Sequence, residues 1–206
     1  MNYQGQAGQD KFVAEVLKFK KDGYFVEIGS ENYISHNNSY VLEKELGWRG
    51  IMIDMTQDCL AGWKKHRQNS VHIIDDATKI DYEQLFATNN VPENVDYLQI
   101  DLDVENRSTL DVLEKFDSTI FNKHKFATIT FEHDIYRGNY YNTRNKSRQI
   151  FKNRGYELVF PDVSCQFLGR LCVFEDWWVH PDLVDMEFIN KNRKSSSILG
   201  KSIKYG

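Results

Sequence analysis

The fold of this chain is indicated most clearly by residues 23–32, which read GYFVEIGSEN. The run from Tyr24 to Ile28 is mostly apolar, begins after the turn Asp22-Gly23 and ends at Gly29. Such a run between two glycine turns predicts a short buried β-strand followed by a tight loop. Upstream, residues 11–19 carry apolar side chains at helical spacing, which predicts a lead-in helix packed on a sheet.

The rest of the chain repeats this alternation of short apolar runs and longer amphipathic segments. Further strands are predicted at residues 50–54, 71–74, 95–102, 126–131, 156–160 and 171–175. Helices are predicted at residues 38–46, 57–68, 82–87, 109–116 and 146–154. This alternation is typical of βα units around a mostly parallel sheet, and the short loop between the last two strands predicts an antiparallel pair at the edge. The sequence therefore indicates an α/β fold.

The length of the chain, 206 residues, suits one sizeable domain. We expect that domain to span residues 1–190, with the lead-in helix within residues 1–22. Residues 191–206 hold a run rich in lysine and serine, which predicts a mobile C-terminal tail. The polar stretch at residues 139–146 is a candidate lid or substrate loop.

Charge and composition exclude several classes of protein. The chain has 26 basic and 30 acidic residues and a net charge of −4, so no broad positive field is available for bulk nucleic-acid binding. No apolar run approaches the roughly 20 residues that a membrane-spanning helix needs. Cys59, Cys165 and Cys172 lack metal-binding spacing and no leader segment is evident, so we expect reduced thiols and a cytoplasmic location.

Acidic residues follow the predicted strands at the points where those strands end. The positions are Glu27 with Gly29, then Asp54, Asp75 with Asp76, Asp101 with Asp103, and Glu132 with Asp134. In an open α/β sheet the carboxyl ends of the strands form the edge where ligands bind. The spacing therefore predicts one ligand site built from several strand ends.

The nature of these residues suggests a nucleoside cofactor without phosphates. Gly29 allows close backbone approach, and the two oxygens of an ionised Asp54 can accept both hydroxyls of a ribose. The loop after the first strand lacks a GxGxxG sequence, so a dinucleotide pyrophosphate has no glycine-rich cradle. S-adenosylmethionine has no phosphates and carries a sulfonium cation that acidic residues attract. We therefore expect methyl transfer, and an NAD-linked reductase is disfavoured.

Three segments resemble the FkbM family of methyltransferases. They are QAGQDKFV at residues 6–13, GYFVEIG at residues 23–29, and the stretch from Ser39-Tyr40 through LEKELGWRGI at residues 42–51. YLQIDLD at residues 97–103 and residues 128–132 are similar to the family's fourth and fifth strands. The resemblance covers residues 4 to about 182 and weakens towards the C-terminus.

This resemblance implies a Rossmann-like class I methyltransferase fold, with a mostly parallel seven-stranded sheet, an antiparallel edge and helices on both faces. It also implies O-methylation of a hydroxyl on a saccharide or other small molecule. The implied cofactor residues are Glu27, Gly29, Ser30, Asn32, Asp54, Met55, Asp76, Ala77 and Asp101. The expected partners are S-adenosylmethionine and a small-molecule or glycan acceptor, and the sequence specifies no oligomeric state.

One position departs from the family pattern. Where members usually show an Asn-Asp-Gly-like turn, this chain has Glu31-Asn32-Tyr33, and the bulky Tyr33 is expected to reshape the methionine pocket. The alternative function is therefore a catalytically altered module that keeps the fold and binds a nucleoside-like ligand or a protein partner.

The chemistry of the transfer suggests two candidate mechanisms. His133 follows the fifth strand and is our first candidate for a general base near neutral pH, with Asp134 to orient it or bind the acceptor and Asp101 beside them. Alternatively, Asp101, Asp103, Glu132 and Asp134 hold a divalent cation such as Mg²⁺, which would acidify the acceptor hydroxyl.

Residues that would contact the acceptor are predicted in two places. Tyr136 and Arg137 lie in the polar loop after the fifth strand and suit a hydroxylated ligand, although a solvated loop is the alternative interpretation. Gln9, with Gln6 and Asp10, is predicted either to touch substrate or to cap the lead-in helix.

Overall fold

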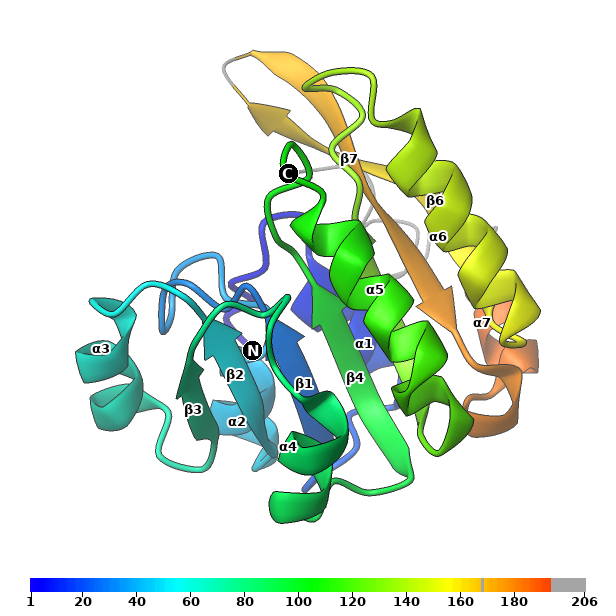
Figure 1. The fold of residues 1–206 in the computed structure, drawn as a ribbon. Helices are drawn as coiled ribbons and strands as arrows, with labels where there is room; N and C mark the ends of the chain where they lie inside the picture. The colour runs from blue at the N-terminus through cyan, green and yellow to red at the C-terminus, as the bar shows by residue number, and fades with distance from the viewer. Residues whose placement is uncertain (168, 194–206) are drawn as a thin grey trace.

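The computed structural model describes residues 1–167 and 169–193 and contains a seven-stranded mixed sheet in the order β3-β2-β1-β4-β5-β7-β6 (Figure 1). The strands are β1 (Tyr24–Ile28), β2 (Arg49–Asp54), β3 (Val71–Ile74), β4 (Asn94–Ile100), β5 (Lys125–Glu132), β6 (Glu157–Phe167) and β7 (Arg170–Val179). The first five strands pair in parallel, whereas β7 pairs antiparallel with both β5 and β6. The predicted sheet, with its antiparallel edge, is confirmed.

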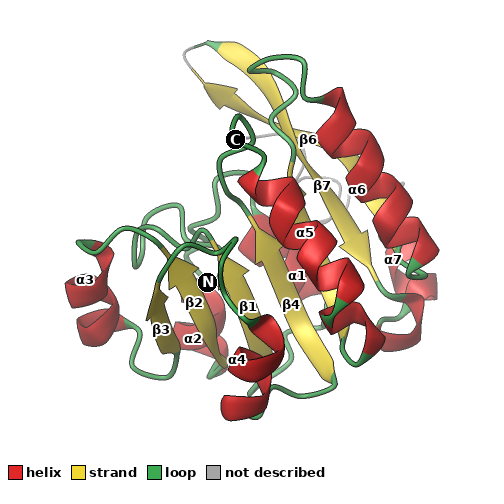
Figure 2. Ribbon diagram, in the orientation of Figure 1, coloured by secondary structure: helices red, strands yellow, loops and turns green. Residues whose placement is uncertain are grey.

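Helices cover both faces of this sheet (Figure 2). They are α1 (Gln9–Val16), α2 (Tyr40–Leu46), α3 (Cys59–His66), α4 (Tyr82–Thr88), α5 (Ser108–Ser118), α6 (Tyr141–Asn153) and α7 (Met186–Asn192), with short 3-10 turns at Ile120–Asn122 and Pro181–Leu183. One apolar cluster joins the sheet to α4, α5 and α6, and a second joins it to α1, α2 and α7. No helix within these described residues is both long and apolar enough to cross a membrane.

The central strands are apolar because both of their faces are covered. All residues of β1 are buried, and so is every residue of β4 except Asn94. Side chains of alternate residues enter different clusters: Val26 and Ile28 contact the α4–α6 layer, and Phe25 contacts the α1–α2 layer. A strand buried on both faces reads as a continuous apolar run, which is why these strands were predictable.

The order of the strands reverses between β1 and β4. From β1 the chain moves outward through β2 to β3, and it then returns to the other side of β1 to form β4. Loops that leave β1 and β4 therefore diverge, and a crevice opens beyond Ile28 and Ile100. Ligands of open α/β sheets bind at such a reversal, so the fold places the candidate site there.

The C-terminal third differs most from the sequence-based prediction. β6 and β7 are longer than predicted, and irregular pairing between Leu158 and Ser164 bends their hairpin. Helix α6 begins at Tyr141, so most of the predicted lid at residues 139–146 is helical. Helix α7 includes residues 191–192 of the predicted tail, and residues 194–206 lie outside the described part of the chain.

Candidate functional site

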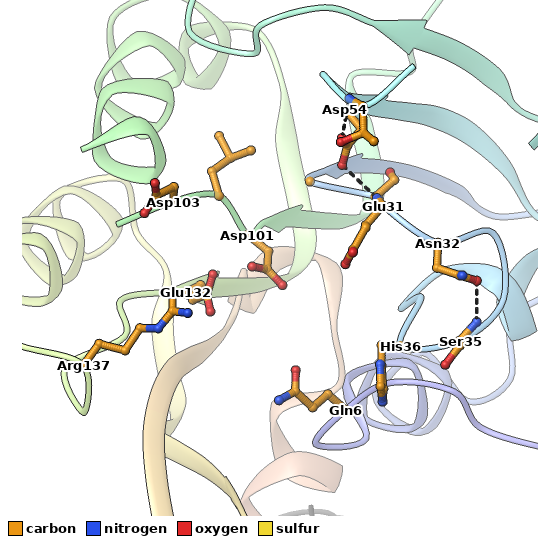
Figure 3. A pocket seen from close by; sticks show the side chains of 14 residues that line it. Gln6, Glu31, Asn32, Ser35, His36, Asp54, Asp101, Asp103, Glu132 and Arg137 are labelled. Atoms are coloured by element: carbon orange, nitrogen blue, oxygen red, sulfur yellow. Dashed lines mark hydrogen bonds between the residues drawn. The ribbon is translucent and has the colours of Figure 1, made fainter. Parts of the chain in front are cut away.

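A cavity of about 440 Å³ lies at the carboxyl ends of β1, β2, β4 and β5 (Figure 3). The predicted residues that line it are Gly29, Ser30, Asn32, Asp54, Asp101, Asp103, Glu132 and Arg137. A smaller cavity of about 90 Å³ adjoins it, and the predicted residues Met55, Asp76 and Ala77 line that space. Asp54, Leu102 and Asp103 line both cavities, so the two cavities are neighbours along the sheet edge, and we refer to them together as the groove.

Gly29 forms the tight turn at the centre of the groove. Its φ is +86°, and its N–H donates to the carbonyl of Ile53 at 2.9 Å. A Cβ added to Gly29 would lie 1.7 Å from the carbonyl oxygen of Asp101. The loop can pass this close to the end of β4 only because residue 29 is glycine.

Asp54 fixes the loop that follows Gly29. Its Oδ2 accepts a hydrogen bond from the backbone N–H of Glu31 at 2.9 Å, and its Oδ1 accepts one from Thr56 at 2.8 Å. Glu31 and Thr56 both line the larger cavity. The carboxylate of Asp54 thus joins the two loops at the point where the two cavities meet.

Asp76 is a turn residue on the wall of the smaller cavity. Its Oδ1 accepts hydrogen bonds from the backbone N–H and the hydroxyl of Thr78, and Lys79 Nζ lies 3.0 Å from Oδ2. These donors lower the pKa of Asp76 to about 2, so the group is ionised at neutral pH. Ala77 beside it is small and apolar and lines the same cavity.

Glu27 does not line either cavity, although the sequence placed it among the cofactor residues. Its carboxylate is fully buried and accepts hydrogen bonds from Asn37 Nδ2 at 3.0 Å, Asn38 N at 3.0 Å and Ser39 Oγ at 2.8 Å. Burial raises the pKa of Glu27, and Arg67 opposes that rise. Through these hydrogen bonds, the buried Glu27 carboxylate holds residues 37–39, at the end of the loop, against the sheet.

Arg67 completes this buried network. Its guanidinium donates to Glu43 Oε2 at 2.9 Å, Asn37 Oδ1 at 2.7 Å and Ser39 Oγ at 2.6 Å, and its side chain has no exposed surface. Glu43 lies on α2 and Arg67 directly follows α3. The network therefore connects two helices to the loop that lines the cavity.

Replacing Arg67 with methionine should lower the free energy of unfolding by about 3 kcal/mol, because Glu43 would keep a buried charge without its cationic partner. Urea denaturation of the two proteins measures the difference. Arg107→Met is the matched control: Arg107 pairs with Asp111 at 3.0 Å on the surface, and its loss should change stability by less than about 1 kcal/mol. Equal effects of the two changes would contradict a structural role for the network.

Tyr33 does not reshape the cavity as expected from the sequence. Its ring stacks on His66 with centroids 4.7 Å apart, and it packs directly against Gly62 of α3. Tyr33 is not among the residues lining the cavity. Tyr33 was the reason for considering a catalytically altered module, and its position outside the cavity lining removes that reason.

Three carboxyl groups gather at the end of the larger cavity formed by β4 and β5. Asp101 and Glu132 line the cavity, and the carboxyl of Asp134 lies against that of Glu132. Burial raises the pKa of Glu132 well above its usual range, and the neighbouring charges of Asp101 and Asp134 raise it further. Burial also raises the pKa of Asp101 and of Asp134, so the three groups retain protons at a higher pH than isolated carboxyls do.

His133 does not face the cavity. Its ring is fully buried, with Nε2 3.6 Å from Asp176 Oδ1 and 3.7 Å from Asp162 Oδ1, and neither ring nitrogen has a hydrogen-bond partner. Successive side chains of a strand alternate between faces, so Glu132 and His133 point in different directions. The position predicted for His133 at the cofactor edge is therefore wrong, and Glu132 occupies it.

The predicted metal ligands do not form a three-ligand set, although Glu132 lies against both Asp101 and Asp134. Among the described residues, the group able to offer three ligand atoms to one ion consists of His133, Asp162 and Asp176 and does not include Asp101, Asp103, Glu132 or Asp134. Both aspartates of that group already accept hydrogen bonds from Arg148 at 2.7–2.8 Å. The structure therefore gives no support to a cation held by the predicted acidic residues.

Two of the three predicted acceptor-binding residues lie away from the cavity. Gln9 is buried and accepts a hydrogen bond from Ala7 N at 2.9 Å, so it stabilises the start of α1. Tyr136 is exposed and does not line the cavity. Arg137 does line it, and its Nη1 donates to Asp134 Oδ2 at 3.1 Å.

Several lining residues were not among the predicted site residues. They are Glu31, Ser35, His36, Thr56 and Leu102. Glu31, Ser35 and His36 belong to the long loop between β1 and α2. The length of this loop is the signal that could have indicated more lining residues in it. Gln6, which the sequence predicted with Gln9 either to touch substrate or to cap the lead-in helix, also lines the cavity.

The chain matches no protein-family model and no curated protein. Solved structures do share its architecture. A TehB-like SAM-dependent methyltransferase from Corynebacterium glutamicum superposes with a TM-score of 0.54 and 10% identity over 87% of this chain and 89% of that one. A precorrin-6y C5,15-methyltransferase from Geobacter metallireducens gives 0.50 and 13%, covering 82% and 86% of the two chains. The fold is that of Rossmann-like methyltransferases. At these identities the likeness shows the fold alone, and the FkbM resemblance stays a prediction.

Proposed function

We propose that this protein is an S-adenosylmethionine-dependent methyltransferase. The observation that carries the proposal is the pair of neighbouring cavities at the strand-order reversal, a small one beside Asp76 and Ala77 and a larger one lined by Asp101 and Glu132. Its shape and its acidic lining suit a nucleoside attached to a cationic tail. The fold of the solved methyltransferases supports the same function.

The residues of the groove suit the parts of this cofactor in order. Met55 and Ala77 offer apolar surface for an adenine ring in the smaller cavity. The carboxylate of Asp54, where the cavities meet, would accept hydrogen bonds from ribose hydroxyls. The turn at Gly29 would let the methionine portion approach the backbone, and the acidic groups beyond it favour positive charge.

A dinucleotide suits the same groove poorly. The charged residues that line the larger cavity are Glu31, Asp54, Asp101, Asp103, Glu132 and one arginine, Arg137, together with His36. A pyrophosphate would meet mostly carboxylates, and the loop after β1 has only one glycine to receive it. Charge and loop structure therefore both favour a phosphate-free cation.

We further propose that the acceptor is a hydroxyl of a saccharide or other small molecule, as the FkbM resemblance implies, and that Glu132 is the general base. When bound, the cofactor supplies a methyl group activated by its sulfonium charge, so a protein group has mainly to orient the hydroxyl and remove its proton. Glu132 lines the cavity at the acceptor end, and its raised pKa brings it closer to the working pH of a base. Arg137 and Gln6, at the same end, are positioned to contact the acceptor.

Binding of S-adenosylhomocysteine tests the proposal directly. At a hundredfold excess over its dissociation constant this ligand should stabilise the protein by about 2.7 kcal/mol, whereas NAD should not. Asp54→Ala should weaken its binding roughly 10- to 100-fold, because hydrogen bonds to a charged group contribute about 1.5–3 kcal/mol. Urea denaturation with and without the ligand measures the stabilisation, and isothermal titration calorimetry measures the dissociation constant.

Asp58→Ala is the control for that change, because Asp58 is exposed, lies four residues further on and makes no side-chain cap bond at the start of α3. It should leave the dissociation constant unchanged. Absence of any stabilisation by S-adenosylhomocysteine would refute the proposed function.

A further inference from the structure

Two of the three cysteines of the chain lie directly opposite each other in the β6–β7 hairpin. The register pairs Cys165 with Cys172, both side chains are buried, and both are free thiols. Both belong to the apolar cluster that packs on α1, so their side chains lie on the same face of the hairpin. Burial raises the pKa of the Cys165 thiol, and the nearby Cys172 thiol raises it further. The two sulfurs are therefore close enough to interact.

The geometry of an antiparallel pair suits a disulfide at this position. Directly opposite residues have Cα atoms about 4.5–5.5 Å apart, and disulfides join Cα atoms about 4.4–6.8 Å apart. The Cβ atoms of such a pair are about 4.5–5.5 Å apart and a disulfide needs about 3.5–4.5 Å, so the strands must approach by about 1 Å or less. The pairing is already irregular between Leu158 and Ser164, next to Cys165, which allows the hairpin to adjust there.

The cysteine pair lies near the free end of the hairpin, where an oxidant reaches it most easily. Strand β6 is at the edge of the sheet, and the hairpin extends beyond the ends of the parallel strands (Figure 1). Two residue pairs, Gln166 with Leu171 and Phe167 with Arg170, separate the cysteines from the turn. Local opening of these two pairs would expose both thiols while the centre of the sheet stays folded.

One of the two thiols also contacts the lining of the larger cavity. Gln6 lines that cavity, and its Nε2 donates a hydrogen bond to Cys165 Sγ at 3.3 Å. The backbone beside Gln6 is held independently of the hairpin, because the N–H of Ala7 donates to Gln9 Oε1 at 2.9 Å. A change at the sulfur of Cys165 should therefore act mainly on the side chain of Gln6.

We propose that Cys165 and Cys172 form a reversible disulfide, and that its formation releases the side chain of Gln6 into the cavity. The oxidant is a small disulfide such as glutathione disulfide. The thiolate of one cysteine attacks it, which forms a mixed disulfide and releases one glutathione. The thiolate of the other cysteine then attacks the protein-bound sulfur, which closes the cross-strand S–S bond and releases the second glutathione. The two protein thiols lose two protons and two electrons, and the two glutathione thiols receive them.

Thiol counting and peptide mapping on the unmodified protein test the disulfide. After incubation with glutathione disulfide, denaturation and alkylation, we expect the number of reactive thiols to fall from three to one, and dithiothreitol should restore all three. Trypsin cuts after Arg170, between the two cysteines, so their peptides stay joined only if the disulfide has formed. Cys59→Ser is the matched control: Cys59 lies on α3, and its loss should leave the joined peptides unchanged. Cys172→Ala should abolish them and leave a mixed disulfide at Cys165.

NMR spectroscopy tests the effect on the cavity. Oxidation should shift the side-chain amide signals of Gln6, identified by their absence from Gln6→Glu, and leave those of Gln84, which is exposed on α4, in place. Three reactive thiols after oxidation, a mixed disulfide that persists in the unmodified protein, or a bond to Cys59 would overturn the inference. A disulfide that leaves the Gln6 signals unshifted would overturn its effect on the cavity. Neither measurement uses a cofactor, so its outcome does not depend on whether the proposed function holds.

Discussion

Gly29→Ala should abolish binding of S-adenosylhomocysteine and lower the free energy of unfolding by at least about 4 kcal/mol. Two effects add at this residue. The φ of +86° is unfavourable for any residue with a Cβ, and that Cβ would lie 1.7 Å from the carbonyl oxygen of Asp101. The clash is with backbone at the end of a central strand, which cannot move without disturbing β1 and β4 together. Urea denaturation and calorimetry measure the two losses.

Gly155→Ala separates these effects. Gly155 has almost the same φ, +84°, but a Cβ there would meet only His180 Nε2, at 3.8 Å. It should therefore show only the conformational penalty of about 1–2 kcal/mol and retain full ligand affinity. If Gly29→Ala were no more damaging than Gly155→Ala, the close approach of the loop to β4 would not be essential.

Glu132→Gln should reduce kcat by about 10²- to 10⁴-fold, with little change in affinity for S-adenosylhomocysteine. Glutamine keeps the size of the side chain but cannot accept a proton. Because a base acts only when ionised, and because burial and the neighbouring carboxyls raise the pKa of Glu132, the activity of the unmodified protein should rise with pH through that raised pKa. The variant should lose this rise. Transfer of a labelled methyl group, followed across the pH range, measures both.

His133→Asn is the comparison for the base assignment. His133 is buried beside Asp162 and Asp176, so its replacement should affect stability and leave the pH dependence of the rate unchanged. A pH profile that changes with His133 and not with Glu132 would reverse the assignment of the base.

The strands of the sheet were predictable because each is a local feature of the sequence. Tyr24–Ile28 and Val71–Ile74 have the predicted bounds, and the positions of Gly29, Asp54 and Asp101 at the strand ends followed from them. In a parallel sheet all carboxyl ends share one edge, so strand bounds alone bring these residues together. That much of the site requires no knowledge of side-chain direction.

Side-chain direction is what the sequence did not reveal. Glu132 and His133 are adjacent at the end of β5, and a shift of one residue in where the strand ends exchanges the one that faces the ligand. Chemical type favoured the histidine, whereas the register with β7 places Glu132 opposite Glu175, with its side chain at the cavity. Element bounds from sequence are uncertain by more than the one residue that decides this question.

Contacts between distant segments were equally inaccessible. Glu27 looked like a ligand-binding acid because it lies at a strand end, yet its partners come from Asn37–Ser39 and, through them, from Arg67. An arginine at the end of an amphipathic helix gives no local sign that it will be fully buried. Such pairings depend on how α2 and α3 pack, which composition and periodicity do not specify.

The buried network beneath the loop has a consequence for how ligands enter and leave. Moving residues 30–39 away from the sheet would separate Arg67 from Asn37 and Ser39 and leave Glu27 without its donors, which would leave two buried charged groups short of hydrogen bonds. The floor of the groove therefore stays rigid during each exchange, and molecules must pass through its open side. Their arrival is then governed by diffusion and by long-range attraction of cations to the acidic rim, without a gating step.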